Sequence, residues 1–127
     1  MTDKPLILIA DDNANDRAAM ADALTKAGYG VIQAIDSGSA RRVAREHDVA
    51  VAIIDHFMTP HDGVEFARYM QLDKINIPMY LVTHDDDSGL LAEASKLGFV
   101  GLLKKPVSSE RLVSAVDRGL KLRRKSV

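Results

Sequence analysis

Five short apolar runs, each followed by a segment with helical spacing, constrain the fold of this chain more than any other feature of its sequence. The runs cover residues 6–10, 31–35, 49–54, 79–82 and 99–103. Four of them are continuously apolar, as expected of strands that are covered on both faces. The second run is interrupted by Gln33, which makes it a weaker strand signal, so we expect it near an edge of the sheet.

The segments between the runs have apolar residues at steps of three and four, which gives each predicted helix one apolar stripe. The last segment shows this pattern with Leu112, Val113, Val116 and Leu120. Ser37 and Ser108 stand where the second and fifth helices need N-caps. Gly28 and Gly98 stand where a left-handed backbone ends a helix. Strand and helix alternate five times, so the pattern predicts an α/β fold with a parallel sheet and helices on both faces.

The composition limits the kinds of function that the chain can have. Its 127 residues predict one domain over residues 1–127, and the lack of cysteine excludes disulfides, thiolate zinc sites and cysteine nucleophiles. A net charge of −1 argues against a chain built mainly to bind nucleic acid. No apolar run approaches the roughly 20 residues that cross a bilayer, so we expect no membrane segment and a cytoplasmic location. Residues 121–127 carry four cations and are expected to fray beyond the fifth helix.

Polar residues with complementary chemistry follow four of the apolar runs. Asp11 and Asp12 come after the first run, and Asp55 ends the third. Thr83 ends the fourth run, and the fifth leads into Lys105. One such acid alone would more simply be a helix cap or turn residue. Because ligands of an open parallel sheet bind outside the carboxyl ends of its strands, we expect these five residues to meet at one rim.

Electrostatics indicates what such a cluster requires. Two carboxylates about 4 Å apart repel by about 4 kcal/mol at an effective dielectric near 20. The site should therefore raise a carboxyl pKa or hold a cation, and its hard oxygen ligands favour Mg²⁺. A lysine and a hydroxyl beside the carboxylates would suit the oxygens of a phosphoryl group. Asp55, which ends the most apolar run, is the best candidate for a carboxylate nucleophile that forms an acyl phosphate.

These residues, in this order, resemble the receiver domain of two-component response regulators across essentially the whole chain. The match lies in Asp11-Asp12, in Asp55 with Asp62-Gly63 after it, in Thr83, and in Lys105-Pro106. The resemblance implies a flavodoxin-like, doubly wound, five-stranded parallel sheet with strand order 2-1-3-4-5 and five helices. It also implies a signalling phosphoprotein rather than an enzyme, acting in signal transduction or in a phosphorelay.

The resemblance further implies a role for each site residue. A histidine kinase or phosphotransfer protein would place a phosphoryl group on Asp55, and Thr83 and Lys105 would contact its oxygens. Magnesium would be held by Asp12, Asp55 and the backbone carbonyl of Phe57, with Asp11 acting mainly through water. The Lys105–Pro106 bond would be cis. A downstream protein would bind the face formed by the fourth helix, the fifth strand and the fifth helix.

The sequence departs from the family's usual pattern near the predicted acceptor. Pro60 stands one position later than the usual proline, from which we expect a modest change in the path of the loop and no loss of the site. His84 replaces the usual small residue after the hydroxyl, and Leu102 replaces the usual switch aromatic. Phe57 and Asp85 occupy the two variable positions that tune hydrolysis of the acyl phosphate in the family.

These departures leave other hypotheses open. His84 and Leu102 would suit a receiver-like interaction module that works without phosphorylation. A Mg²⁺-dependent phosphohydrolase also uses an aspartyl nucleophile, but no segment here is long enough for a substrate cap. His56, His61 and His84 fall in loops near the acids, where a zinc or copper site is conceivable, although their spacing is more typical of solvent-exposed loop histidines.

Overall fold

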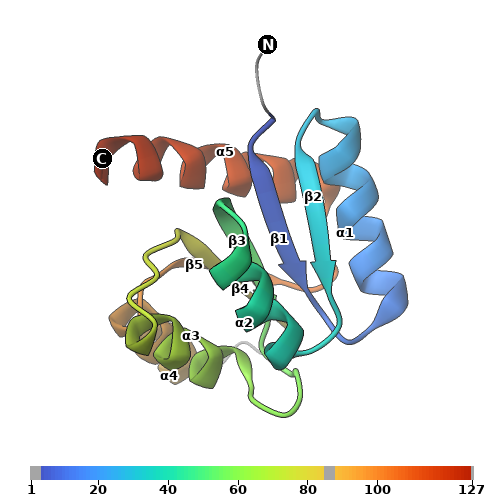
Figure 1. The fold of residues 1–127 in the computed structure, drawn as a ribbon. Coiled ribbons are helices and arrows are strands. Elements are labelled where there is room, and N and C mark those ends of the chain that lie inside the picture. The colour runs from blue at the N-terminus through green and yellow to red at the C-terminus, as the bar shows by residue number, and fades with distance from the viewer. Residues whose placement is uncertain (1–3, 85–87, 127) are drawn as a thin grey trace.

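The computed structural model describes residues 4–84 and 88–126 and places a five-stranded parallel sheet between two layers of helices (Figure 1). The strands are β1 Leu6–Ala10, β2 Gly30–Ala34, β3 Val49–Asp55, β4 Met79–Thr83 and β5 Phe99–Lys104. The helices are α1 Ala14–Lys26, α2 Ser37–Glu46, α3 Gly63–Leu72, α4 Ser88–Lys96 and α5 Ser109–Ser126. The strand order β2-β1-β3-β4-β5 confirms the predicted topology, and β2 lies at an edge as its polar residue indicated.

The register of the sheet aligns the carboxyl ends of the central strands. Ala10, the last residue of β1, pairs with Ile54 of β3, and Asp55 pairs with Val82 of β4. Every residue of β3 is buried, in keeping with its central position and its unbroken apolar sequence. The residues that follow β1, β3 and β4 therefore start from neighbouring points on one rim.

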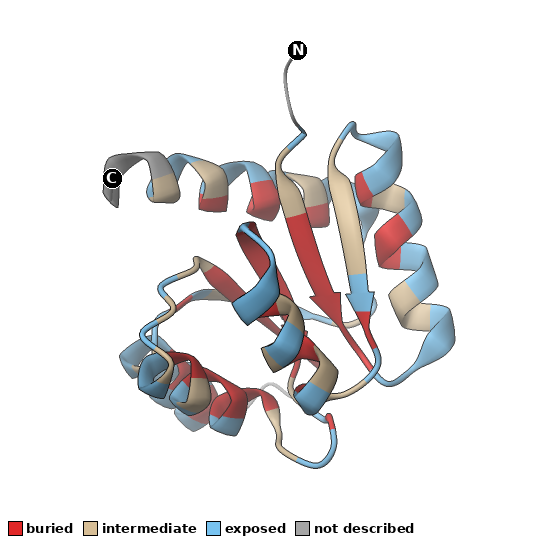
Figure 2. Cartoon of the chain, in the orientation of Figure 1, coloured by how far each residue is buried: buried red, intermediate tan, exposed pale blue. Residues whose placement is uncertain are grey.

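Two separate apolar cores lie on the two faces of the sheet, because successive side chains of a strand point to opposite faces. One core joins alternate strand residues to helices α2, α3 and α4, and the other joins the remaining strand residues to α1 and α5. Figure 2 shows the buried residues on the strands and on those sides of the helices that face the sheet. This arrangement leaves the rim as the place where polar groups can gather.

The core against α1 and α5 contains an unusually large strand residue, Tyr80, which is 2% exposed. Two glycines make room for its ring. A β-carbon at Gly101, its partner on β5, would lie 3.0 Å from Cε1 of the ring, and one at Gly119 of α5 would lie 3.5 Å from Cε2. The tyrosine hydroxyl is buried and has no hydrogen-bond partner among the described residues.

Helix ends confirm three of the four predicted capping residues and correct one. Gly28 and Gly98 have φ values of 97° and 96°, and the Ser108 hydroxyl accepts a hydrogen bond from the Arg111 N–H. The predicted N-cap at Ser37 is wrong, because Asp36 caps α2 by accepting a 2.7 Å hydrogen bond from the Ser39 N–H.

Helix α5 extends to residue 126 and so includes most of the stretch 121–127 for which a frayed basic tail is predicted. Lys121 forms an ion pair with Asp117 one turn earlier, and Arg123 forms one with Asp48, which precedes β3. Among the described residues, no helix combines the length and apolar character that a membrane span requires.

Candidate functional site

Three aspartates meet at the rim of the sheet, as the order of the strands predicted. Asp11 and Asp55 are buried and Asp12 is exposed. One carboxylate oxygen from each lies within 4.8 Å of the others. Two oxygens on opposite sides of one Mg²⁺ ion would be about 4.2 Å apart, so the carboxylates are gathered nearly as closely as one ion requires. Three hard oxygen donors with an open, solvent-facing side fit a magnesium ion that keeps part of its water.

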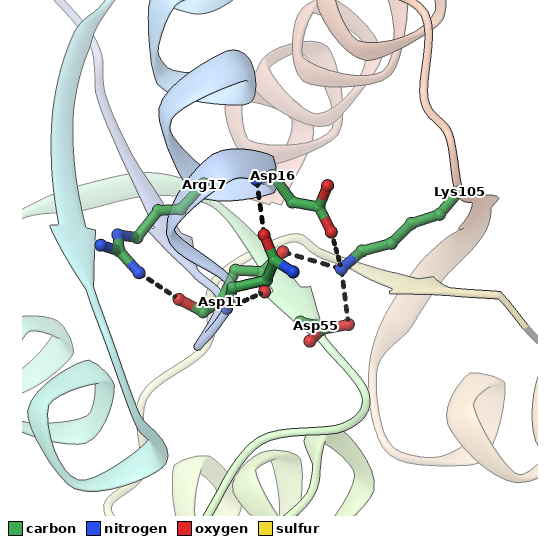
Figure 3. Close-up of polar contacts among 6 residues, drawn as sticks. Asp11, Asp16, Arg17, Asp55 and Lys105 are labelled. Carbon is green, nitrogen blue, oxygen red and sulfur yellow. Dashed lines mark hydrogen bonds and ion pairs between the residues drawn. The ribbon is translucent and has the colours of Figure 1, made fainter.

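Lys105 brings a positive charge into the same cluster (Figure 3). Its Nζ donates hydrogen bonds of 2.9 Å to Asp11 Oδ2 and to Asp16 Oδ2, and it lies 3.4 Å from Asp55 Oδ1. The lysine side chain is 7% exposed, so these contacts are largely shielded from water. Its backbone N–H donates to the Thr83 carbonyl at 2.8 Å, which extends the pairing of β4 and β5 up to the lysine.

The charges of the cluster change the acidity of two groups. Burial and, after it, the neighbouring charge of Asp11 together raise the pKa of Asp55 to about 6, although Lys105 acts to lower it. Burial alone would lower the pKa of Lys105. Its hydrogen bonds to Asp11 and Asp16 and the charges of Asp55 and Asp11 outweigh burial and raise that pKa above its ordinary value. The site without a metal ion therefore pairs a firmly charged ammonium with a carboxylate that is only weakly acidic.

The loop after β1 holds Asp11 in place. Its Oδ1 accepts a 2.9 Å hydrogen bond from the Asn13 N–H, and its backbone carbonyl accepts one of 2.8 Å from Arg17 Nη1. Arg17 also donates to the side chain of Gln33 on β2. Asn13 is the N-cap of α1 and accepts from the Asp16 N–H. The start of the helix thus positions Asp11 and Asp16, the two aspartates that accept 2.9 Å hydrogen bonds from Lys105.

The loop after Asp55 is fastened to helix α2. Ser37 donates from its backbone N–H and its hydroxyl to the Thr59 carbonyl, at 2.9 and 3.1 Å. The same hydroxyl accepts from the His61 N–H at 3.0 Å. Both Thr59–Pro60 and Lys105–Pro106 are cis, which confirms the second of these as predicted. The acidic cluster is present with the proline at the shifted position.

The Asp62-Gly63 pair of the motif has a structural task at the start of α3. Asp62 caps the helix by accepting from the Glu65 N–H, and the Glu65 side chain accepts in return from the Asp62 N–H. A β-carbon on Gly63 would lie 2.5 Å from Leu81 Cδ1 and 3.3 Å from the Asp55 carbonyl. A glycine is needed here because the helix begins directly against the strand end that carries Asp55.

The remaining predicted residues lie in different environments. Thr83 is buried at the end of β4, and the Phe57 side chain is 55% exposed two residues after Asp55. Leu102 is half-buried and packs against the core beneath α4. His84 is exposed, and Asp85 lies outside the described residues. Asp16 was not predicted as a site residue, although its position three residues after the helix N-cap was visible in the sequence.

The histidines near the acids do not form a metal site in the described part of the chain. The group of metal-ligating side chains found there contains Asp11, Asp12 and Asp55 alone. His61 instead lies with Nδ1 3.4 Å from Glu65 Oε2, one turn along α3. His56 Nδ1 is buried and has no hydrogen-bond partner among the described residues. The three histidines are thus loop residues that form no common metal site among the described residues.

Curated relatives of the chain include regulators and a chemotaxis protein. The chain is 29% identical over 121 residues to the transcriptional regulatory protein FixJ of Bradyrhizobium diazoefficiens, covering 95% of this chain and 59% of FixJ. It is 26% identical over 120 residues to a probable chemotaxis protein CheY of Rhizobium etli, covering 92% of this chain and 93% of that protein. The chain thus spans about three-fifths of FixJ and nearly all of CheY.

Solved structures and the family profile agree with this similarity. A CheY-like receiver domain from Methanospirillum hungatei superposes with a TM-score of 0.90 at 19% identity, covering 98% of this chain and 99% of that one. The chemotaxis response regulator CheY4 of Vibrio cholerae gives 0.86 at 27% identity, covering 92% and 99%. The profile of the response regulator receiver domain matches residues 7–117, a range that contains the three aspartates and the lysine of the rim. The chain therefore belongs to the response regulator receiver domains of two-component signalling.

Proposed function

We propose that this receiver takes a phosphoryl group onto Asp55 from a histidine kinase or a phosphotransfer protein. The observation that carries the proposal is the gathering of Asp55 with two further carboxylates and with the Lys105 ammonium at one rim. Magnesium would be held by Asp11, Asp12 and Asp55 and by the backbone carbonyl of Phe57. When bound, the ion neutralises carboxylate charge and draws in a phosphoryl oxygen.

The chemistry is a displacement at phosphorus. An oxygen of the Asp55 carboxylate forms the new bond to phosphorus, and the bond from phosphorus to the donor's imidazole nitrogen breaks with its electron pair going to that nitrogen. Lys105 would donate a hydrogen bond to a phosphoryl oxygen, and we assign the same role to the hydroxyl of Thr83. Deprotonated Asp55 is the reactive form, so its pKa of about 6 leaves it mostly competent at neutral pH.

Output would pass to a protein that binds the face formed by α4, β5 and α5. Leu91 on α4 is 46% exposed and Val100 on β5 is 44% exposed, which gives that face accessible apolar residues. Phosphorylation adds negative charge and acceptor oxygens near Thr83 and Lys105, at the ends of β4 and β5. The proposal is therefore a signalling switch, with any loss of phosphate by hydrolysis incidental to it.

The test is phosphoryl transfer followed by intact-protein mass spectrometry. The protein with Mg²⁺ and a histidine kinase or a small phosphodonor should gain one acid-labile phosphoryl group, and Asp55→Asn should gain none. Asp22→Asn is the matched control, because Asp22 is an exposed residue of α1 that pairs with Lys26. Incorporation that persists in Asp55→Asn would show that the acceptor assignment is wrong.

Beryllofluoride with Mg²⁺ separates this proposal from the interaction module that Leu102 and His84 suggest. Beryllofluoride is a phosphoryl analogue that binds an aspartate carboxylate, so a competent site should show chemical-shift changes at the rim in NMR spectra. A protein that binds Mg²⁺ but shows no response to beryllofluoride would favour the module. Turnover of a generic phosphate ester would instead favour a phosphohydrolase.

A further inference from the structure

A carboxylate outside the predicted site, Asp16, binds the Lys105 ammonium, which under the proposed function contacts the phosphoryl group. It contacts Lys105 Nζ at 2.9 Å, as closely as Asp11 does and more closely than Asp55 at 3.4 Å. An ammonium has three N–H donors, and the structure directs Nζ at three carboxylates. A phosphoryl oxygen can therefore gain a full hydrogen bond from Lys105 only when one of these contacts lengthens or breaks.

The three contacts differ in how easily they can be given up. Asp11 is fully buried and accepts a second hydrogen bond from the Asn13 N–H, so leaving its charge unpaired would be costly. Asp55 is the proposed acceptor and carries the phosphoryl group itself. The side chain of Asp16 is 42% exposed, so water can solvate its carboxylate once Lys105 leaves it.

Asp16 and Asp55 compete for the position of the Lys105 ammonium. In the view of Figure 3, Asp16 reaches the ammonium from the side opposite Asp55. Movement of Nζ toward Asp55 therefore lengthens its contact with Asp16. Asp16 and Lys105 also line a cavity of about 130 Å³ between α1 and the start of α5, which gives the carboxylate space to turn away.

We propose that Asp16 is a positioning residue that holds the Lys105 ammonium back from Asp55 in the unphosphorylated protein and releases it when a phosphoryl group arrives. This inference rests on the proposed function, because it concerns the same lysine. Asp16 would thus compete with the phosphoryl group for the hydrogen bonds of Lys105. Removing its charge should strengthen the binding of a phosphoryl analogue without strengthening the binding of Mg²⁺, since a cation gains nothing from the loss of a nearby carboxylate.

The experiment measures the apparent affinity for beryllofluoride at saturating Mg²⁺, by NMR titration of the full chain. Asp16→Asn and Asp16→Ala should each bind beryllofluoride about two- to fivefold more tightly than the unaltered protein, the range expected when a partly exposed ion pair is lost. Asp16→Glu restores a carboxylate at this position and should return the affinity toward the original value. The gain in beryllofluoride affinity should be smaller at high salt, because salt screens the partly exposed ion pair between Asp16 and Lys105.

Asp22→Asn is again the matched control, since it removes the same charge from the same helix at a residue that pairs only with exposed Lys26 in the described contacts. Equal gains in Asp22→Asn and Asp16→Asn would refute the proposal, because the effect would then be one of net charge. If the unaltered protein binds beryllofluoride and Asp16→Asn and Asp16→Ala bind it equally or more weakly, the role of Asp16 is refuted and the proposed function is left intact. A protein that binds Mg²⁺ and ignores beryllofluoride altogether would overturn the proposed function itself.

Discussion

Replacing Asp55 with asparagine should stabilise the protein in the absence of Mg²⁺, although it removes the proposed acceptor. Burial and the charge of Asp11 raise the pKa of Asp55 from its ordinary value of 3.8 to about 6. The folded state therefore disfavours the charged form, in spite of the ion pair with Lys105. Asparagine keeps the shape of the carboxyl group without the charge, so it relieves this cost.

The magnitude follows from the two pKa values. A tenfold change in acidity corresponds to about 1.4 kcal/mol, so a rise from 3.8 to about 6 corresponds to at most about 3 kcal/mol at neutral pH. Because the pKa is higher in the folded state, folding takes up a proton between pH 3.8 and about 6, and stability falls as pH rises through that window. The advantage of Asp55→Asn should therefore be absent near pH 3, grow up to about pH 6 and stay constant above it.

Urea unfolding measures this difference. Circular dichroism is the suitable probe, because the chain has no tryptophan whose fluorescence could be followed. Asp22→Asn, on the exposed side of α1, should change the free energy of unfolding by no more than about 0.5 kcal/mol. Added Mg²⁺ should stabilise the unaltered protein by mass action and narrow the gap to Asp55→Asn. A less stable Asp55→Asn at pH 7 without metal would refute the reasoning, because Lys105 would then outweigh both burial and Asp11.

Three further substitutions test separate features. Tyr80→Phe removes a buried hydroxyl without a partner among the described residues and should raise the free energy of unfolding by about 1 kcal/mol; a loss of stability in urea unfolding would mean that the hydroxyl is satisfied. Gly63→Ala should cost about 1–3 kcal/mol in the same assay, because its β-carbon would lie 2.5 Å from Leu81 Cδ1 inside the core; an unchanged unfolding midpoint would contradict this. Asp12→Ala should weaken Mg²⁺ binding at least about tenfold by calorimetry while changing metal-free stability by under about 0.5 kcal/mol, since this carboxylate is exposed; equal Mg²⁺ affinity would remove Asp12 from the ligand set.

The sheet and the acidic cluster could be predicted because each depends on short-range patterns. Unbroken apolar runs indicated buried parallel strands, and strands of one direction bring their carboxyl ends to one rim. Asp11, Asp12 and Asp55 then had to be neighbours once β1 and β3 paired. The strand order itself came from the resemblance to receiver domains, since the alternation of strands and helices permits several orders.

Features that depend on contacts between distant segments could not be predicted in the same way. Asp16 lies in the first turn of a helix, where an acid is favoured by the helix dipole, and its contact with Lys105 spans 89 residues of sequence. Arg123 of α5 likewise contacts Asp48, 75 residues earlier in the chain. Asp36 and Ser37 are both good capping residues, and the backbone at their junction decides between them.

The hydrogen bonds of Ser37 to the loop after Asp55 affect how this region opens. One buried hydroxyl joins the first turn of α2 to both sides of Pro60, through the Thr59 carbonyl and the His61 N–H. Segments linked in this manner tend to open together as one cooperative unit. In hydrogen–deuterium exchange, the amides of Ser37 and His61 should therefore exchange at matched rates, because the loop after Asp55 would open together with the first turn of α2.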